Sequence, residues 1–239
     1  MAPHFSPKES MFGLFKKRPA PPAAIPSFAS PELSRLVPRL RHASSIEGYA
    51  DTVAEAERQG DELPGELPVF ARIDGDLIVS YAFNQPDRFV TVTHADARRL
   101  GLSEAQIHAT ALQNLYACIA GKVAIKKLVL SPPNAPGTDD PAVPFFGYLE
   151  VGEDMEASCL LLEPLWRSLA DSVAGELCFV VPTPNHCFFC GAADPALVAM
   201  QGVADGIRAD AGPKALSAMT FTRHDGQVRV MDLSARQLS

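Results

Sequence analysis

Prolines divide this chain into segments that can and cannot form regular structure. The chain has 239 residues and 21 prolines, five of which lie between residues 19 and 31 and four between residues 131 and 143. Proline fixes φ and lacks a backbone N–H, so neither stretch holds a helix or a central strand. We therefore expect a disordered Pro/Ala-rich tail over residues 1–31, followed by one α+β domain over residues 32–239. Its two lobes, about 32–130 and 144–239, are joined by a Pro-rich loop at 131–143.

Composition narrows the class of protein. Apolar residues make up 47% and charged residues 21% of the chain, which is typical of a soluble globular protein. The 21 basic and 28 acidic residues leave a net charge of −7, which argues against a generic nucleic-acid binder. No apolar run approaches the roughly 20 residues of a membrane-spanning helix. Five cysteines, an odd number without a secretory signal, indicate a cytoplasmic protein.

The tail contains a short apolar cluster followed by three cations, Met11–Arg18. This segment itself resembles a translation start, so the sequence leaves open whether the protein begins at Met1 or at Met11. We interpret the segment as a basic leader. The alternative is contact with an anionic membrane surface, which so short an apolar stretch would make only weakly.

The sequence of the first lobe predicts a polar helix, three short strands and a second helix. The polar helix falls within residues 46–66. Strands are expected at Val69–Ile73, Leu77–Phe83 and Phe89–Thr93, and Asp74-Gly75 predicts a hairpin between the first two. This order predicts an antiparallel β-meander. Ser103 and Gln106 have the spacing of a capping box that opens a helix through about Ile119. A further strand is expected at Lys122–Leu130.

The second lobe has the element order of a ferredoxin-like unit. The expected strands are Phe145–Val151, Leu177–Val181, His186–Cys190, Leu216–Thr222 and a final Val228–Met231. An apolar helical face from Met155 to Val173 predicts one helix kinked at Pro164. Asp194-Pro195 predicts the start of another helix. The order β-α-β-β-α-β is that of the split β-α-β, ferredoxin-like fold.

Several ordered segments resemble the bacterial family called domain of unknown function 1444. They are Leu36–His42, Gly75–Phe83, Leu100–Ser103, Leu112–Leu115, Glu156–Leu162, Leu165-Trp166, Gly175–Leu177 and Val180–Pro182. The resemblance covers roughly residues 35–232 and implies a cytosolic α+β protein of bacterial type. It implies no reaction, ligand or partner. The chain departs from the family at Cys187–Cys190, where an aliphatic strand is expected, and at Asn84, where an aspartate is expected.

The most suggestive chemical motif is His186-Cys187-Phe188-Phe189-Cys190. Two thiols and an imidazole can ligate zinc or perform dithiol chemistry. However, a structural zinc site needs four ligands, and no second ligand pair accompanies this one. In a strand, Cys187 and Cys190 also point to opposite faces. We therefore interpret these cysteines as small buried core residues and predict no metal, no cofactor and no catalytic residue.

Five scattered polar residues are candidates for a binding site: Arg41, Asp76, Tyr81, Asn84 and Asn114. The basic cluster around Arg41 can line a polar pocket with Asp76, Tyr81 and Asn84. Asn114 falls at the edge of an apolar helix face. For Asn114 we favour hydrogen bonds to neighbouring backbone over ligand contact.

Because no nucleophile, metal or phosphate-binding pattern is complete, the sequence favours a non-enzymatic protein-binding or adaptor module. One alternative is an enzyme whose site is assembled from the five scattered residues. Another is a toxin-neutralising protein of the immunity type, suggested by acidity and a compact α+β composition.

Overall fold

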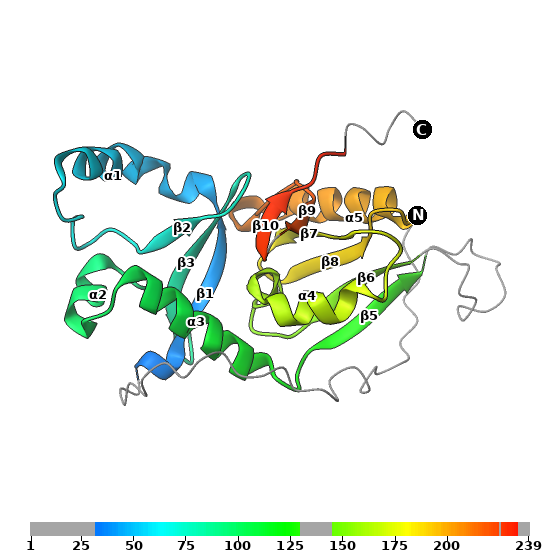
Figure 1. The fold of residues 1–239 in the computed structure, drawn as a ribbon, viewed down its shortest axis with the longest axis horizontal. Helices are drawn as coiled ribbons and strands as arrows, with labels where there is room; N and C mark the ends of the chain where they lie inside the picture. Colours follow the sequence, from blue (N-terminus) through cyan, green and yellow to red (C-terminus); the bar gives the residue numbers. More distant parts are fainter. Residues whose placement is uncertain (1–31, 130–144, 225, 234–239) are drawn as a thin grey trace. The chain divides into compact units, whose positions relative to one another are not determined.

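The computed structural model describes residues 32–129, 145–224 and 226–233 (Figure 1). They form an N-terminal unit, residues 32–120, and a C-terminal unit that begins at Gly121. Both contain helices and antiparallel strands, which confirms the α+β class. The boundary at residue 120 differs from the expected junction at 131–143, because the strand at Ala124–Val129 pairs within the C-terminal unit. The predicted tail and Pro-rich loop lie outside the described residues.

The N-terminal sheet is built around one long strand. Its strands are β1 (Leu36–His42), β2 (Phe70–Arg72), β3 (Leu77–Asn84) and β4 (Phe89–Thr91). Both predicted hairpins, β2–β3 and β3–β4, are present. The sheet is nevertheless not the simple meander that we expected. β1 pairs along the whole of β3, so β2 and β4 share the opposite edge. Pro38 fits β1 because this strand lies at the edge of the sheet.

Helices follow local capping signals in this unit. They are η1 (Leu33–Arg35), η2 (Ala43–Ile46), α1 (Glu47–Gln59), α2 (His94–Leu100) and α3 (Glu104–Ile119). The predicted capping box is confirmed, since the Ser103 hydroxyl accepts from the Gln106 N–H and the Gln106 side chain accepts from the Ser103 N–H. The buried face of α3, which includes Ile107, Ala111 and Leu115, packs on β1 and β3. Helix α3 therefore covers one face of the sheet formed by β1 and β3.

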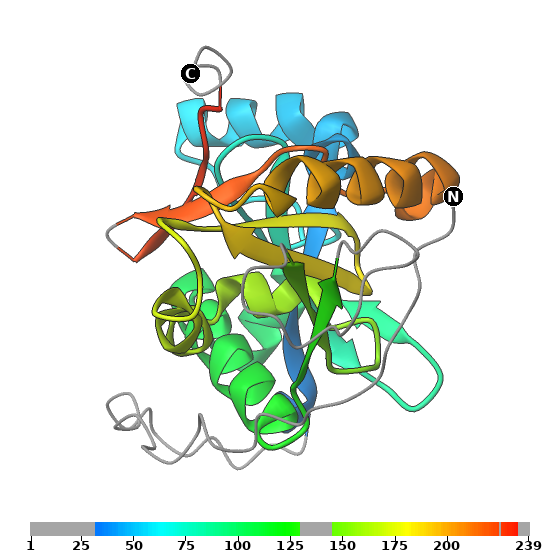
Figure 2. The same cartoon turned by 90° about the vertical axis from the view of Figure 1, so that its right-hand side faces the viewer.

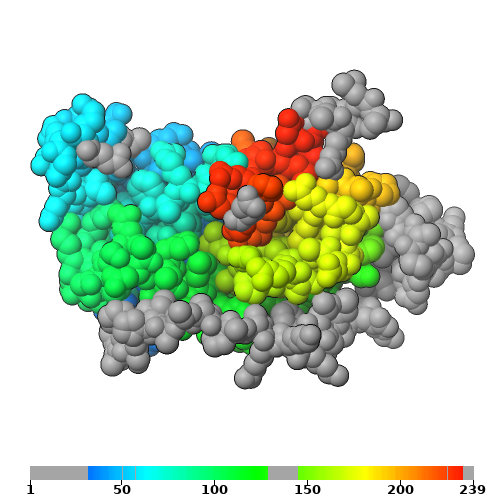
Figure 3. All heavy atoms as spheres, in the orientation of Figure 1, coloured from blue at the N-terminus to red at the C-terminus, as the bar shows by residue number. Residues whose placement is uncertain are grey.

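The C-terminal unit contains a six-stranded antiparallel sheet in the order β10-β9-β7-β8-β6-β5. Its strands are β5 (Ala124–Val129), β6 (Phe145–Glu150), β7 (Leu177–Thr183), β8 (His186–Gly191), β9 (Phe221–His224) and β10 (Gln227–Val230). The edge hairpin β9–β10 lies on the surface, in red in Figure 3. The predicted element order is present, and β8 lies between β6 and β7 as in a split β-α-β unit. The ferredoxin-like prediction is wrong for the fourth strand. β9 pairs with β7 because β5 already occupies the outer edge of β6.

Helices cover both faces of this sheet. They are η3 (Ala157–Leu161), α4 (Glu163–Ala170), α5 (Ala196–Asp210) and η4 (Gly212–Lys214). The orange α5 in Figure 2 packs on the face that carries Phe146, Cys178 and Phe188. On the other face, the Trp166 ring of α4 stacks on Phe179 with ring centroids 4.9 Å apart.

The prediction of a single kinked helix over residues 155–173 is wrong. The backbone leaves the helical region at Leu162, where φ is −92° and ψ is 89°. Pro164 therefore occupies the first turn of the separate helix α4, where its missing N–H has no intrahelical partner to lose. The apolar spacing still marks the buried side, since Met155, Cys159 and Trp166 are all buried.

Candidate binding site

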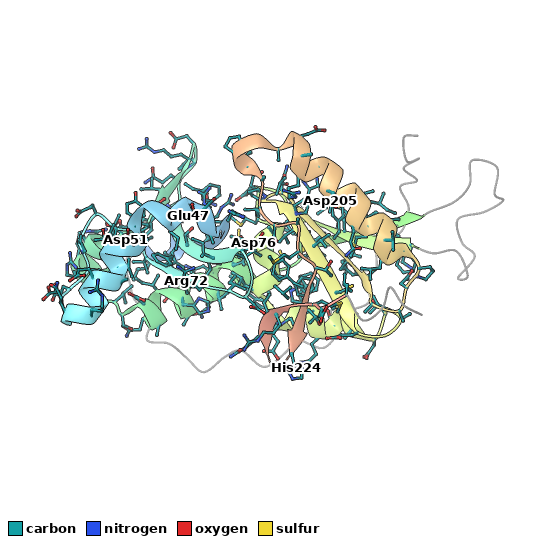
Figure 4. The ribbon with its side chains drawn as sticks, turned by 90° about the horizontal axis from the view of Figure 1, so that it is seen from above. Glu47, Asp51, Arg72, Asp76, Asp205 and His224 are labelled. Atoms are coloured by element: carbon teal, nitrogen blue, oxygen red, sulfur yellow. The ribbon has the colours of Figure 1, made fainter. Side chains whose placement is uncertain are left out.

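The five predicted site residues do not converge. Arg41 is exposed on β1 opposite Ile78, and Asp76, labelled in Figure 4, precedes the start of β3. Asn84 ends β3, seven residues beyond Leu77. At about 3.3 Å per residue, the two ends of this strand are roughly 23 Å apart. A common pocket for Arg41, Asp76 and Asn84 is therefore not formed.

The remaining two candidates are held by the protein itself. Tyr81 is 2% exposed, and its hydroxyl lies 2.8 Å from Nδ1 of His108 on α3. Burial raises the pKa of Tyr81 and lowers the pKa of His108, so both groups are neutral near pH 7. The Asn114 amide donates to the carbonyls of Leu33 and Leu36 at 2.7 and 2.8 Å, as the preferred interpretation predicted.

The cysteine motif is part of the core. Cys190 belongs to the cluster under α5 and its Sγ lies 3.7 Å from Sγ of Cys178. Cys187 lies three residues earlier on β8 and therefore points to the opposite face. Burial raises the pKa of Cys187, and that of Cys159 to about 12, which keeps both as thiols near pH 7. Within the described residues, no three His, Cys, Asp or Glu side chains are grouped as a metal site requires.

A pocket of about 300 Å³ lies in the C-terminal unit, where the end of β6 and the turn after it meet the β7–β8 turn. Its lining residues are Tyr148, Leu149, Glu150, Gly152, Glu153, Asp154, Glu156, Asn185 and His186. Gly152, Glu153 and Asp154 have φ values of 87°, 60° and 54°, and two successive left-handed non-glycine residues are uncommon. The turn after β6 therefore has an unusual backbone held by specific contacts.

Glu156 supplies those contacts and has one oxygen left over. The side chain is buried, with 6% of its surface exposed. Its Oε1 accepts from the backbone N–H groups of Val151 and Gly152 at 3.1 and 2.7 Å. Its Oε2 is also buried, and no described residue donates a hydrogen bond to it. A buried carboxylate oxygen without a donor is costly, and this one belongs to a residue that lines the pocket.

The half-buried His186 contributes a second acceptor to the pocket lining. With the Asn185 amide oriented as in the structure, the Thr183 hydroxyl donates to Asn185 Oδ1 at 2.7 Å. The same hydroxyl lies 2.7 Å from Nδ1 of His186. Because this hydroxyl has one proton, Nδ1 of His186 must be the donor to it. Burial lowers the pKa of His186, an effect that the nearby Glu156 charge opposes. The neutral ring therefore carries its lone pair on Nε2.

The pocket thus combines acceptors with negative charge. Glu150, also in its lining, pairs with Lys126 at 2.6 Å, and Glu153 and Asp154 add two carboxylates from the turn after β6. The Thr183 hydroxyl is a poor nucleophile here because its proton is committed to Asn185 rather than to a base. The arrangement suits the binding of a hydrogen-bond donor.

A larger surface depression of about 640 Å³ lies along α1, the helix that carries Asp51 in Figure 4. Its lining side chains are mostly exposed, and Arg58 and Glu55 within it pair with each other. It contains no buried polar group that lacks a partner, and we regard it as ordinary surface.

The sequence interpretation missed Glu156 as a site residue and considered His186 only beside the cysteines. The available signal was Glu156 itself, a charged residue directly before the apolar run Ala157–Leu162. Its proximity to His186 depends on the β7–β8 turn about thirty residues later in the chain, which no local pattern predicts.

Comparisons with known proteins add no relative: no family model, curated protein or solved structure matches the chain. Among the described residues, no helix has both the length and the apolar character needed to span a membrane.

Proposed function

We propose that this chain is a non-enzymatic protein-binding module of the bacterial cytosol. It uses the pocket of its C-terminal unit to hold a segment of a partner protein. The observation that carries the proposal is the buried Oε2 of Glu156, which has no hydrogen-bond donor among the described residues and belongs to a residue that lines the pocket beside His186. Buried polar groups in folded proteins are normally satisfied, so spare acceptors at a pocket favour a ligand.

The resemblance to the domain of unknown function 1444 is compatible with this proposal and supplies no competing activity. The alternative of an enzyme built from Arg41, Asp76, Tyr81, Asn84 and Asn114 has less support, because Asn84 lies at the other end of β3 from Arg41 and Asp76, and Tyr81 and Asn114 are held by the protein. A toxin-neutralising role would be one form of protein binding.

Co-purification from cells tests the proposal. The full-length tagged protein is expressed at native level, and proteins bound to it are quantified by mass spectrometry. Glu153→Arg reverses a charge at the exposed rim of the pocket, and Asp171→Arg makes the same change on an exposed residue outside the pocket lining. We expect a stoichiometric partner with the wild type and with Asp171→Arg, and its loss with Glu153→Arg. A partner retained equally by all three proteins, or none at all, would contradict the proposal.

A further inference from the structure

Four buried side-chain atoms of the described residues lack a hydrogen-bond partner: Thr110 Oγ1, Glu156 Oε2, Arg208 Nε and Arg223 Nε. The two arginines make polar contacts of their own, since Arg223 donates from Nη1 to the Leu160 carbonyl and Nε of Arg208 lies 3.9 Å from Asp205. Thr110 is a neutral hydroxyl. Glu156 Oε2 is therefore the one anionic acceptor in this group, and it is the atom that most requires a donor.

Resting on the proposed function, we propose that the pocket binds a guanidinium or primary ammonium group, the end of an arginine or lysine side chain of the partner protein. A cation with several N–H donors fits a carboxylate oxygen and a neutral imidazole nitrogen at the same time. Such charge-assisted hydrogen bonds are the stronger kind, and guanidinium offers five N–H donors in a planar fork.

The lining distributes the roles for such a ligand. Glu156 is anchored through Oε1 by two backbone N–H groups, and its Oε2 is closed to solvent, so the side chains over this oxygen must move for a ligand to reach it. His186 is oriented by Thr183 so that Nε2 is the acceptor. Glu153 and Asp154 add two further carboxylates to the lining, which attract a cation from solution.

Two features favour a side-chain end over a metal ion or a compact solute. Metal ions in proteins usually take four or more ligands, whereas an N–H donor needs one acceptor per bond. The lining also includes the half-buried Tyr148, an aromatic residue suited to contact with the methylene stem of arginine or lysine. A volume of about 300 Å³ accommodates one such side chain.

Titration of the isotope-labelled full-length protein with methylguanidinium chloride tests this inference by NMR. We expect saturable shifts of the Gly152, Glu156 and His186 signals, with a dissociation constant on the order of millimolar for so small a probe. Tetramethylammonium chloride carries the same charge but no N–H donor, and we expect it to produce no saturable shift at these signals.

Glu156→Gln is the decisive variant, because the amide oxygen can still accept from Val151 and Gly152 while an N–H₂ replaces Oε2. We expect methylguanidinium binding to weaken at least tenfold in this variant and to remain unchanged in Asp171→Asn. An unperturbed amide spectrum outside the pocket shows that the variant is folded. Equal shifts with tetramethylammonium, or equal affinity of the Glu156→Gln protein, would overturn the inference.

The source of the cation is tested with a short peptide containing one arginine and blocked ends, compared with free arginine. Tighter binding of the peptide supports a protein partner, and tighter binding of the free amino acid overturns that part of the inference. The two proposals fail separately. If the cellular partner is lost with Glu153→Arg but kept with Glu156→Gln, the protein-binding function stands and the cation site does not.

Discussion

Each unit of this protein contains a pair of polar residues of which one is buried and the other, a histidine, is half-buried, and the two pairs differ in the hydrogen-bonding capacity that they leave unused. In the N-terminal unit, the Tyr81 hydroxyl lies 2.8 Å from Nδ1 of His108, and neither side chain is among those with a buried polar atom that lacks a partner. In the C-terminal unit, Glu156 is held through Oε1 and His186 through Nδ1, and the buried Oε2 of Glu156 has no donor among the described residues. Both histidines have a pKa lowered by burial. A lowered histidine pKa is therefore common to both pairs, whereas a buried carboxylate oxygen without a donor is found at Glu156 and not in the Tyr81–His108 pair.

The same contrast separates structural stability from binding. Polar groups that complete one another stabilise the fold and leave little for a ligand to gain. Groups that remain unsatisfied cost stability until a ligand supplies the missing donor. Substitutions of Tyr81 or Asn114 in the N-terminal unit should therefore change the free energy of unfolding and leave pocket binding intact, whereas Glu156→Gln should weaken pocket binding and leave the free energy of unfolding nearly unchanged.

The largest effect on stability is expected at Asn114. Asn114→Ala leaves the carbonyls of Leu33 and Leu36 without the amide donor that now reaches both. We expect the free energy of unfolding to fall by about 2 to 3 kcal/mol. Urea unfolding followed by circular dichroism measures it, and hydrogen exchange should quicken around Leu33–Leu36. Gln113→Ala, at the exposed neighbouring position, is the control and should change stability by less than about 0.5 kcal/mol. An equally small effect of Asn114→Ala would contradict the structural role of this amide.

Tyr81→Phe is expected to have the next largest effect. It removes one buried hydroxyl and leaves Nδ1 of His108 without its partner, so we expect a loss of about 1 to 1.5 kcal/mol in the same unfolding measurement. Methylguanidinium affinity should be unchanged. A variant that kept full stability but lost cation binding would break the comparison, because it would place Tyr81 in a functional site.

Local signals in the sequence predicted much of the fold. The Asp74-Gly75 hairpin is present with Gly75 at φ 71°, and the Ser103–Gln106 capping box opens α3 as expected. These features depend on contacts between residues a few positions apart. Strand β1 was not predicted from its pattern, because Pro38 interrupts a run that has no clear alternation. The placement of β9 beside β7 rather than β6 depends on β5, and competition between strands for one edge is not encoded locally.

The candidate site was less predictable than the fold for a related reason. The contacts of Glu156 with Val151 and Gly152 are local, but nothing in the amino-acid sequence shows that its second oxygen is buried without a donor. That property depends on packing against distant segments. Conversely, Tyr81 and Asn114 are polar residues among apolar ones, and the partners that satisfy them lie 27 and about 80 positions away.

A change of opposite sign is expected for Glu156→Gln. The substitution removes a buried charge whose Oε2 has no donor, and it keeps the acceptor for the Val151 and Gly152 N–H groups. We expect the free energy of unfolding to stay within about 0.5 kcal/mol of wild type or to rise. Glu156→Ala removes the anchor as well and should be less stable than Glu156→Gln by about 1 to 2 kcal/mol. A clear destabilisation by Glu156→Gln would mean that Oε2 is already satisfied, for example by an internal water.

The smallest effect concerns the titration of His186. Burial lowers the pKa of this ring, and the Glu156 charge partly opposes that effect. In the Glu156→Gln protein the pKa of His186 should therefore fall further below its ordinary value, as an NMR titration of the ring between about pH 5 and pH 8 would show.

The lowered pKa of His186 also links stability and binding to pH. A lowered pKa means that the folded protein holds fewer protons than the unfolded chain. The stability contributed by neutral His186 is thus present above the ordinary histidine pKa and is lost as the pH falls through the folded-state value. Over the same interval the ring gains a proton on Nε2, the acceptor for the ligand, so methylguanidinium affinity should decline together with stability. The Tyr81–His108 pair provides the internal comparison, because protonation of His108 should reduce stability without any change in cation binding. If binding proved independent of the charge on His186, Glu156 alone would constitute the acceptor, and the contrast between the two units would depend on a single oxygen atom.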